Sequence, residues 1–424
     1  MNTYREDFFS LPESVEPEDY VIGTYIARVD TSDFLQYAEM LAVQESTGSW
    51  VSLPMETSEL VREHGAKVIS AFEVPDYEYD QPGEKRYFVI GIAFPVKNFG
   101  YQVPMLINTV IGVISYFGDI KMVDLVLPQN YVKQFPGPRF GVENMREYLG
   151  VSTGPLCGCI LKPATGLSPQ QAGKLFYEAA VGGANLIKDD EKTANAPYSS
   201  ISHRVKECMK AEKRVYEEIG RHTLYAVNVT DTPDRVIENA KAAVDAGGNM
   251  LMISHLTVGI GMIQVLAESS EIGVPIQVHP DFLGGYSRSP LWGMSSHLSL
   301  GKLPRLCGAD VSCFAISYVP TSREKLKKAV IALQSTFCGL KRSWPLMGGG
   351  MHPGMVKKVM EQFGSDIILC AGGGIHAHPM GTRAGAMAMR QAIDGVLQGH
   401  TIEQTAQQFK ELGKAVEAWG IVKD

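Results

Sequence analysis

The sequence predicts an α/β protein whose C-terminal part is a (β/α)₈ TIM barrel and whose N-terminal part is a smaller α+β domain of the ferredoxin-like type. Three observations lead to this prediction. Short apolar runs alternate with helical stretches after residue 135, the alternation makes eight units over roughly 250 residues, and polar or glycine residues repeatedly end the apolar runs. We therefore expect domains at 1–135 and 136–424. A doubly wound open sheet is the alternative arrangement of these units.

The first 135 residues mix strand-like and helix-like pieces without a repeating rhythm. Their patterns predict strands at 20–28 and 87–94, a helix at 34–46 and a polar surface turn at 76–85. Two prolines and two glycines within 135–141 block regular structure, so we place the junction between the domains there.

The eight apolar runs after the junction are the expected barrel strands. They lie at 156–162, 185–189, 224–228, 250–254, 276–279, 311–316, 345–348 and 367–371. The expected helices lie at 169–181, 201–219, 233–245, 262–269, 323–333, 353–363 and 381–397, with an added amphipathic helix at 401–419. The basic stretch 204–214 is interleaved with acids, which is typical of the solvent-exposed face of a helix.

Composition excludes several classes of protein. The 424 residues are 45% hydrophobic and 20% charged, which is ordinary for a globular protein, and the net charge of −7 disfavours a nucleic-acid binder. The N-terminus lacks the apolar stretch of a signal peptide, and the longest apolar run, 105–117, is shorter than the ~20 residues of a membrane span. Seven cysteines without a CxxC pair indicate a reduced, cytoplasmic location.

The active site of such a barrel lies at the C-terminal ends of its strands, where Lys188, Asp190 and Glu191 form the sharpest signal. Strand alternation puts Lys188 and Asp190 on one face, and two carboxylates can hold Mg²⁺. A neutral Lys188 amine that captures CO₂ becomes a carbamate, which is an anionic oxygen ligand. Lowering a lysine pKa by ~3 units costs about 4 kcal/mol, within the range of burial. The alternative is a solvated acidic loop with a local ion pair.

Lys162 and two glycine runs follow other strands. Lys162 ends the first run and can serve as a general acid/base or an electrostatic clamp; a snorkelling lysine is the alternative. The runs 348–350 and 372–374 end the seventh and eighth strands, where barrels commonly bind phosphate through backbone N–H groups; tight turns are the alternative.

Three further polar residues end strands and are candidates for contact with substrate. Asn228 ends the third strand, His255 follows the fourth and His279 ends the fifth. The histidines can bind substrate oxygens or transfer a proton, and hydrogen bonding within the core is the alternative. We assign His376 and His378, beside the second glycine run, a structural role.

Together these motifs resemble the RuBisCO large-chain superfamily, especially its non-carboxylating RuBisCO-like branch. The segments that carry the resemblance are 182–191, Lys162-Pro163 and 372–379, and the match extends from about residue 135 to 397. The resemblance implies an α+β N-domain, a barrel and a homodimer or a multiple of dimers. It also implies Mg²⁺ as cofactor, held by a carbamate on Lys188 and by Asp190 and Glu191.

The same resemblance assigns roles to the other candidates. Lys162 resembles the acid/base lysine and His279 a histidine that contacts substrate. Gly349, Gly350, Gly372 and Gly373 resemble the phosphate cradle. In the N-terminal part, the segment containing Thr47 and Trp50 resembles the family's segment that reaches into a neighbouring subunit's site.

Several positions depart from the carboxylase pattern. The stretch 315–320 lacks the lysine of a mobile loop, and Pro280 replaces an arginine that helps hold a second phosphate. Ala164 replaces a second lysine, while Gln44 and Val113 replace a glutamate and an asparagine of the N-domain. These departures predict an enzyme that does not fix CO₂ and that keeps one phosphate site.

Within the branch, the segments 221–228, 301–303 and 352–355 resemble the 2,3-diketo-5-methylthiopentyl-1-phosphate enolases of methionine salvage. This resemblance implies an enolate formed on a small monophosphorylated keto substrate, although those enzymes carry a proton-abstracting lysine where this chain has Val113. The alternatives are a decarboxylase of a phosphorylated 3-oxo sugar acid (the 3-oxo-isoapionate 4-phosphate type), a non-catalytic relative, and a divalent-metal aldolase that needs no carbamate.

Overall fold

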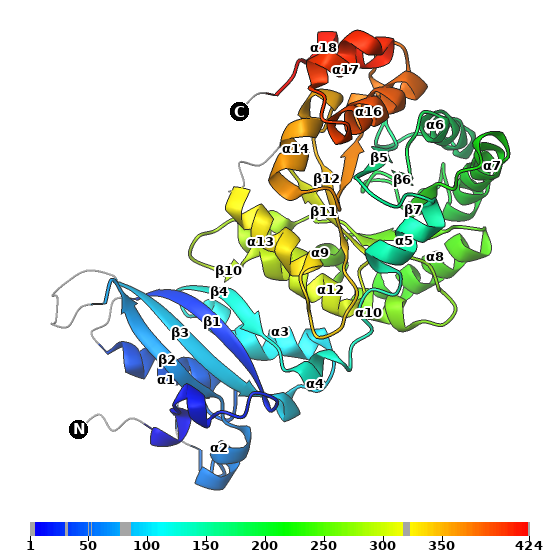
Figure 1. Ribbon diagram of the computed structural model, residues 1–424. Coiled ribbons are helices and arrows are strands. Elements are labelled where there is room, and N and C mark those ends of the chain that lie inside the picture. Colours follow the sequence, from blue (N-terminus) through cyan, green and yellow to red (C-terminus); the bar gives the residue numbers. More distant parts are fainter. Residues whose placement is uncertain are drawn as a thin grey trace. The chain divides into compact units, whose positions relative to one another are not determined.

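The computed structural model describes residues 5–29, 33–49, 51, 53–76, 86–316 and 323–422 (Figure 1). The chain forms two compact units. The first contains Met1–Phe135 and Phe282–Ser299, and the second contains Pro136–Asp281 and Leu300–Asp424. Residues 282–299, which the sequence prediction placed in the barrel domain, therefore cluster with the N-terminal unit.

The first unit is built on a five-stranded sheet in the order β10-β4-β1-β3-β2. Strands β1 and β3 pair antiparallel, as do β1 with β4 and β2 with β3, whereas β10 lies parallel to β4. The strands are β1 (Tyr20–Val29), β2 (Lys67–Val74), β3 (Arg86–Pro95), β4 (Asp119–Val126) and β10 (Gly293–Met294). The helices are α1 (Phe34–Gln44), α2 (Ser58–His64), α3 (Val103–Ile111), α4 (Gln129–Val132) and α11 (Leu283–Ser287).

Alternating burial explains why the central strand of this sheet was visible in the sequence. Along β1, Val21, Gly23, Tyr25 and Ala27 are buried and the alternate residues are half-buried, which is the two-residue period of a strand. The Tyr25 hydroxyl donates a hydrogen bond to the Val110 carbonyl, 2.5 Å away, and so ties β1 to α3. The predicted elements at 20–28, 34–46 and 87–94 are confirmed as β1, α1 and β3, and most of the predicted turn, 77–85, lies outside the described residues.

The second unit is a closed barrel of eight parallel strands, which confirms the predicted fold class (Figure 1). The open-sheet alternative is wrong, because the last strand pairs with the first through Leu369 and Cys157 and closes the ring. The strands are β5 (Leu156–Ile160), β6 (Leu186–Lys188), β7 (Leu224–Asn228), β8 (Met250–Ile253), β9 (Ile276–Val278), β11 (Val311–Ala315), β12 (Trp344–Gly348) and β13 (Ile368–Ala371).

Helices follow the barrel strands in the order that the sequence predicted. The helices that correspond to the predicted ones are α6 (Pro169–Val181), α7 (Ile201–Ile219), α8 (Pro233–Asp245), α10 (Gly261–Glu268), α13 (Arg323–Gln334), α14 (Val356–Phe363) and α16 (Thr382–Leu397). The others are α5 (Gly141–Leu149), α9 (His255–Val258), α12 (Leu303–Cys307), α15 (Gly373–His376), α17 (Ile402–Gln408) and α18 (Lys410–Trp419). None of the described helices has the length and apolar character that crossing a bilayer requires.

The prediction of a single helix at 401–419 is wrong. Phe409 adopts an extended backbone, with φ −124° and ψ 122°, and this one residue separates α17 from α18. The helical period continues across the break, so the sequence pattern did not reveal it.

The barrel core is packed with apolar side chains at the N-terminal ends of the strands. Leu186, Leu224 and Ile368 lie in one cluster with Val142 and Met145 of α5. Because α5 packs against this end, the opposite end, where the strands finish, remains for a site.

Asp310 is a buried carboxyl that joins three segments of the barrel unit. Its Oδ1 accepts hydrogen bonds from the N–H groups of Phe140 and Gly141, at 2.8 and 2.7 Å, and its Oδ2 accepts one from Ile276 N–H at 2.9 Å. Burial outweighs these three hydrogen bonds and raises the pKa of Asp310 from 3.8 to about 6.

We expect Asp310→Ala to lower the free energy of unfolding by at least about 3 kcal/mol, because it leaves three buried N–H donors without an acceptor. Between pH 3.8 and about pH 6, Asp310 is protonated in the folded protein, whereas the same side chain has lost its proton in the unfolded chain. The stability that Asp310 supplies is therefore greatest below about pH 4 and declines as pH rises through about 6. Urea denaturation at several pH values checks this, with exposed Asp245→Ala as control. A gap between wild type and Asp310→Ala that widens with rising pH would contradict it.

Candidate active site

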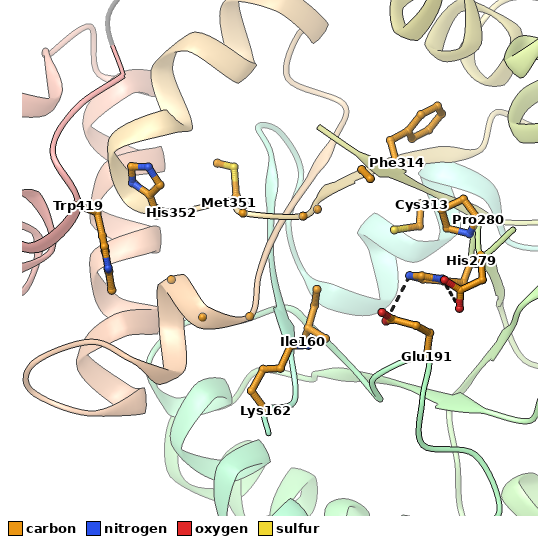
Figure 2. A pocket seen from close by; sticks show the side chains of 18 residues that line it. Ile160, Lys162, Glu191, His279, Pro280, Cys313, Phe314, Met351, His352 and Trp419 are labelled. Atoms are coloured by element: carbon orange, nitrogen blue, oxygen red, sulfur yellow. Dashed lines mark ion pairs between the residues drawn. The ribbon is translucent and has the colours of Figure 1, made fainter. Parts of the chain in front are cut away.

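A cavity of about 390 Å³ opens at the C-terminal ends of the barrel strands (Figure 2). Its lining comes from the ends of β5, β9, β11, β12 and β13 and the residues that follow them, together with Glu191 after β6 and Trp419 at the end of α18. The lining residues are Ile160, Lys162, Glu191, His279, Pro280, Asp281, Cys313, Phe314, Ala315, Gly348, Gly349, Gly350, Met351, His352, Gly372, Gly373, Gly374 and Trp419.

The cavity has two chemically different sides. Figure 2 shows His352 and Trp419 on one side and Glu191 and His279 on the other, with Lys162 between them. The glycine-rich turn after β12 leads directly to His352 on the first side, and Gly374 of the turn after β13 packs against His352, where a Cβ would lie 3.0 Å from its Cα. Ionisable groups dominate the second side.

Lys188 ends β6 and is fully buried; it does not line the cavity itself, but it contacts Glu191, which does. Its Nζ donates a hydrogen bond to the Asp189 carbonyl at 2.7 Å and lies 3.6 Å from Oε2 of Glu191. The inward direction of this side chain is the one that strand alternation predicted. The amine is thus removed from water with one carboxylate beside it.

Glu191 projects from the turn after β6 toward two cationic groups. Its Oε2 lies 3.6 Å from Lys188 Nζ and 3.5 Å from His279 Nε2. Burial alone would raise the pKa of this carboxyl, but the charges of Lys188 and His279 outweigh it and lower the pKa to about 2. Glu191 is therefore a carboxylate throughout the neutral range.

His279 follows β9 and lies between two carboxylates, as the dashed lines in Figure 2 show. On the side away from Glu191, its Nδ1 lies 3.5 Å from Oδ2 of Asp281. Burial works against the charged imidazolium, yet the Cys313 sulfur and the Asp281 carboxylate raise the pKa of His279 to about 9.

Asp190 is buried and pairs with Lys162. The Lys162 Nζ lies 2.5 Å from Asp190 Oδ2, and Oδ1 accepts a hydrogen bond from Lys192 N–H at 3.1 Å. The Lys162 side chain is about one-third exposed and lines the cavity, so its amine can reach both Asp190 and a ligand.

Asp189, which the sequence analysis did not select, points the other way and forms a buried ion pair with Arg204 of α7. The guanidinium contacts both carboxylate oxygens, at 3.1 Å from Nε and 3.0 Å from Nη2, and the Tyr225 hydroxyl donates at 2.6 Å. The prediction that 204–214 is a solvent-exposed face is therefore wrong at Arg204, which is 2% exposed. This pair anchors the strand end that carries Lys188.

Asn228 and His255, both candidates for substrate contact, lie behind the site rather than in the cavity wall. The Asn228 amide donates to the carbonyls of Asp190 and Glu191, at 3.4 and 3.1 Å. His255 is fully buried, and its Nδ1 lies 3.0 Å from the His279 carbonyl. Their visible contacts position the backbone of the residues that do line the cavity.

The four selected glycines all line the cavity. Gly349 and Gly350 have φ values of 75° and 79°, which favour glycine. A Cβ on Gly372 would lie 3.2 Å from Lys162 Cε, so a side chain there would press on the lysine, whereas Gly373 faces open space.

The N-terminal candidates belong to the first unit. Thr47 donates from Oγ1 to Oε1 of Glu56 at 3.0 Å. Trp50 lies outside the described residues, as do 317–320 of the loop after β11. Val113 is about half exposed in the first unit.

Sequence reasoning did not select several residues of the cavity wall, among them Asp281, His352 and Trp419. Asp281 follows His279 by two positions, and this spacing was the only local signal for it. His352 follows the first glycine run, and its Nδ1 is buried without a hydrogen-bond partner among the described residues. Trp419 lies at the end of α18, and the centroid of its ring is 6.2 Å from that of His352 and 6.1 Å from that of His378. No sequence pattern predicted that Trp419 lies near the mouth of the barrel.

The donor set fits a divalent metal only if Lys188 changes its charge. No group of three His, Cys, Asp or Glu side chains able to hold a metal occurs in the described part of the chain. Asp190 and Glu191 supply two carboxylates, each now beside an ammonium. Carbamylation would turn Lys188 from a cation into an oxygen anion, and one divalent cation would restore the balance of charge.

Nearly the whole chain is similar to known proteins. Residues 141–419 match the family described as ribulose bisphosphate carboxylase large chain, catalytic domain, and residues 11–131 match the corresponding N-terminal domain. A ribulose bisphosphate carboxylase-like protein of Archaeoglobus fulgidus is 42% identical over 416 residues, covering 96% of this chain and 95% of that protein. A 2,3-diketo-5-methylthiopentyl-1-phosphate enolase of Bacillus cytotoxicus is 36% identical over 405 residues, covering 94% and 97%.

Solved structures share the fold. A RuBisCO-like protein (MtnW) of Alicyclobacillus acidocaldarius has a TM-score of 0.87 at 33% identity, covering 96% of this chain and 100% of that one. Octameric Rubisco of Pyrococcus horikoshii has a TM-score of 0.88 at 28% identity, covering 100% and 98%. Dimeric Rubisco of Hyperthermus butylicus has a TM-score of 0.87 at 28% identity, covering 99% and 100%.

We expect Arg204→Ala to destabilise the protein by about 3–5 kcal/mol, because it leaves the buried Asp189 carboxylate without its cation. Lys213→Ala on the same helix removes an exposed charge and should cost less than about 1 kcal/mol. Urea unfolding followed by circular dichroism measures both. Equal effects of the two substitutions would show that the Asp189–Arg204 pair does not anchor the strand end.

Proposed function

The chain belongs to the ribulose bisphosphate carboxylase large-chain family, and from this premise we propose that it is an Mg²⁺-dependent enzyme that forms an enolate on a monophosphorylated keto compound. The reaction we favour is that of the 2,3-diketo-5-methylthiopentyl-1-phosphate enolases. Relatives with that name are 35–36% identical to this chain over more than nine-tenths of its length.

The observation that carries the proposal is the fully buried Lys188 amine beside Glu191. The uncharged form of a lysine amine is the one that reacts with CO₂ to give a carbamate. The carbamate, Asp190 and Glu191 would then hold Mg²⁺ through oxygen atoms. Bound there, Mg²⁺ would act as a Lewis acid that stabilises negative charge on the enolate oxygen.

The chain's own residues orient the substrate along the cavity. The phosphate fits the glycine side, where the turns at 348–350 and 372–374 bring backbone close to a ligand. The unpartnered Nδ1 of His352 lies on the same side and can take part in a hydrogen bond with a phosphate oxygen. The keto group then lies toward Lys162 and Glu191.

Lys162 is the residue we assign to proton transfer. Its amine lies in the cavity wall, and Asp190 holds it at 2.5 Å. A lysine in this position can exchange a proton with the carbon next to the enolate. His279, fixed between Glu191 and Asp281, is placed to donate a hydrogen bond to a substrate oxygen when that oxygen displaces one of the two carboxylates.

A decarboxylase of a phosphorylated 3-oxo sugar acid is the second candidate, and Val113 favours it. In the enolases the resemblance assigns this position to the lysine that removes a proton, and valine has no group for that step. Loss of CO₂ breaks a carbon–carbon bond and leaves its electron pair in the enolate, so no base is needed. Lys162 then delivers a proton to the carbon.

Carboxylation of a bisphosphate does not fit this chain. Pro280 lines the cavity at the position that resembles an arginine of a second phosphate site, and a proline side chain cannot bind phosphate. We also propose a homodimer, since solved members of the family are described as dimeric and octameric. All seven cysteines are free, which supports the expected cytoplasmic location.

Supplying each substrate class to the protein with Mg²⁺ and bicarbonate tests the reaction. For the enolase we expect conversion of 2,3-diketo-5-methylthiopentyl 1-phosphate to its enol, with exchange of a carbon-bound proton in deuterium oxide. For the decarboxylase we expect CO₂ release from 3-oxo-isoapionate 4-phosphate. Turnover of neither compound would reject both reactions and favour a non-catalytic relative.

We expect Mg²⁺ and bicarbonate together, but neither alone, to stabilise the wild-type protein, by about 2.7 kcal/mol at a hundredfold excess over Kd. Lys188→Ala should abolish this gain, and Lys192→Ala should retain it, because Lys192 also lies 3.6 Å from Glu191 but is exposed. Thermal unfolding measures the effect. Equal stabilisation of wild type and Lys188→Ala by Mg²⁺ alone would exclude the carbamate and favour an aldolase-type metal site.

A further inference from the structure

We infer that Asp281 determines substrate class in this cavity by excluding ligands with a second phosphate and admitting monophosphates with an uncharged tail. The inference rests on the proposed function, because it concerns the same cavity, and it adds a residue with a selective role.

The first argument is position. Asp281 lines the cavity, and its side chain is 42% exposed, so the carboxylate faces the solvent-filled space and not the core. Its Oδ2 lies 3.5 Å from Nδ1 of His279, and Figure 2 shows His279 across the cavity from His352 and Trp419. A ligand whose phosphate occupies the glycine side extends its tail toward Asp281.

The second argument is the balance of charge at the tail end. Among the lining residues of this side, His279 is the group that can carry a positive charge. Its two ring nitrogens already lie 3.5 Å from Glu191 and 3.5 Å from Asp281. The positive charge of His279 is therefore already balanced by two carboxylates. One of them, Asp281, faces the cavity and would repel a second phosphate.

The third argument is the apolar character of the remaining wall. Pro280, Cys313 and Ala315 also line the cavity near the end of β9 and β11. None of these side chains carries a charge that could compensate a phosphate. A hydrocarbon or thioether tail loses no hydrogen bonds on contact with them, whereas a phosphate would lose water there and gain no charged donor from these three side chains.

Exclusion by a carboxylate is more effective than the mere absence of a binding group. Without an arginine, the second phosphate would add nothing to the binding free energy. With a carboxylate at this position, the second phosphate makes the binding free energy less favourable. Asp281 thus distinguishes a monophosphate from a bisphosphate that is otherwise identical to it. A serine or asparagine at this position would lose the repulsion and keep a similar size.

A pair of ligands that differ in one phosphate tests the inference. Isothermal titration of the full chain, with Mg²⁺ and bicarbonate, compares xylulose 1-phosphate with xylulose 1,5-bisphosphate. We expect wild type to bind the monophosphate at least about tenfold more tightly. Asp281→Asn should narrow this ratio by about tenfold, because the affinity for the bisphosphate should rise relative to that for the monophosphate. Asp281→Ser is the second variant, and should behave in the same way.

Asp245→Asn is the matched control, because it removes the same charge at an exposed site on α8, away from the cavity lining. It should leave the ratio of affinities unchanged. The inference is overturned if wild type prefers the bisphosphate, if it binds neither ligand, or if both Asp281 variants keep the wild-type ratio. The titration measures binding alone, so failure to turn over any substrate would reject the proposed reaction without altering the ranking of the two ligands.

Discussion

The constraint on which the site depends is the pairing of charges in a region with little water. A buried ion is stable only when an opposite charge or several hydrogen bonds accompany it. Here each acid at the strand ends has a cation, and the pairs are Lys188–Glu191, Lys162–Asp190, Arg204–Asp189 and His279–Asp281. A change of charge at one member disturbs its neighbours. In the proposed function, this coupling would link a carbamate on Lys188 to the binding of Mg²⁺.

The barrel could be predicted from sequence because its signals are local. Parallel strands buried on both faces read as short apolar runs, and the helices between them have a clear period. Alternation along β6 likewise sufficed to direct Lys188 into the barrel and to distinguish Asp190 from Asp189. The pattern could not show which residue pairs with Asp189. Its partner Arg204 lies in a basic stretch, and only the packing of α7 against the barrel buries it.

The remaining differences arise from contacts between distant segments. Residues 282–299 lie in the sequence between barrel strands β9 and β11, but their strand β10 pairs with β4 of the first unit. A strand of two residues is too short to be predicted from a local pattern. Trp419 reaches the cavity from the last described helix, and Asp281 acquires its role from the fold around it rather than from a motif. Local sequence therefore revealed the residues at strand ends but not those brought in by tertiary packing.

The way α18 ends has a practical consequence for handling the protein. Beyond Trp419 the chain runs against the turn after β12, where Val422 N–H donates to the Gly354 carbonyl at 3.0 Å and the Gly420 carbonyl lies too close to Gly354 for any side chain there. The last described residues are thus fastened to the segment that carries His352. A change to residues 420–422, for labelling or for attachment, would therefore act on the segment that carries His352 at the mouth of the barrel.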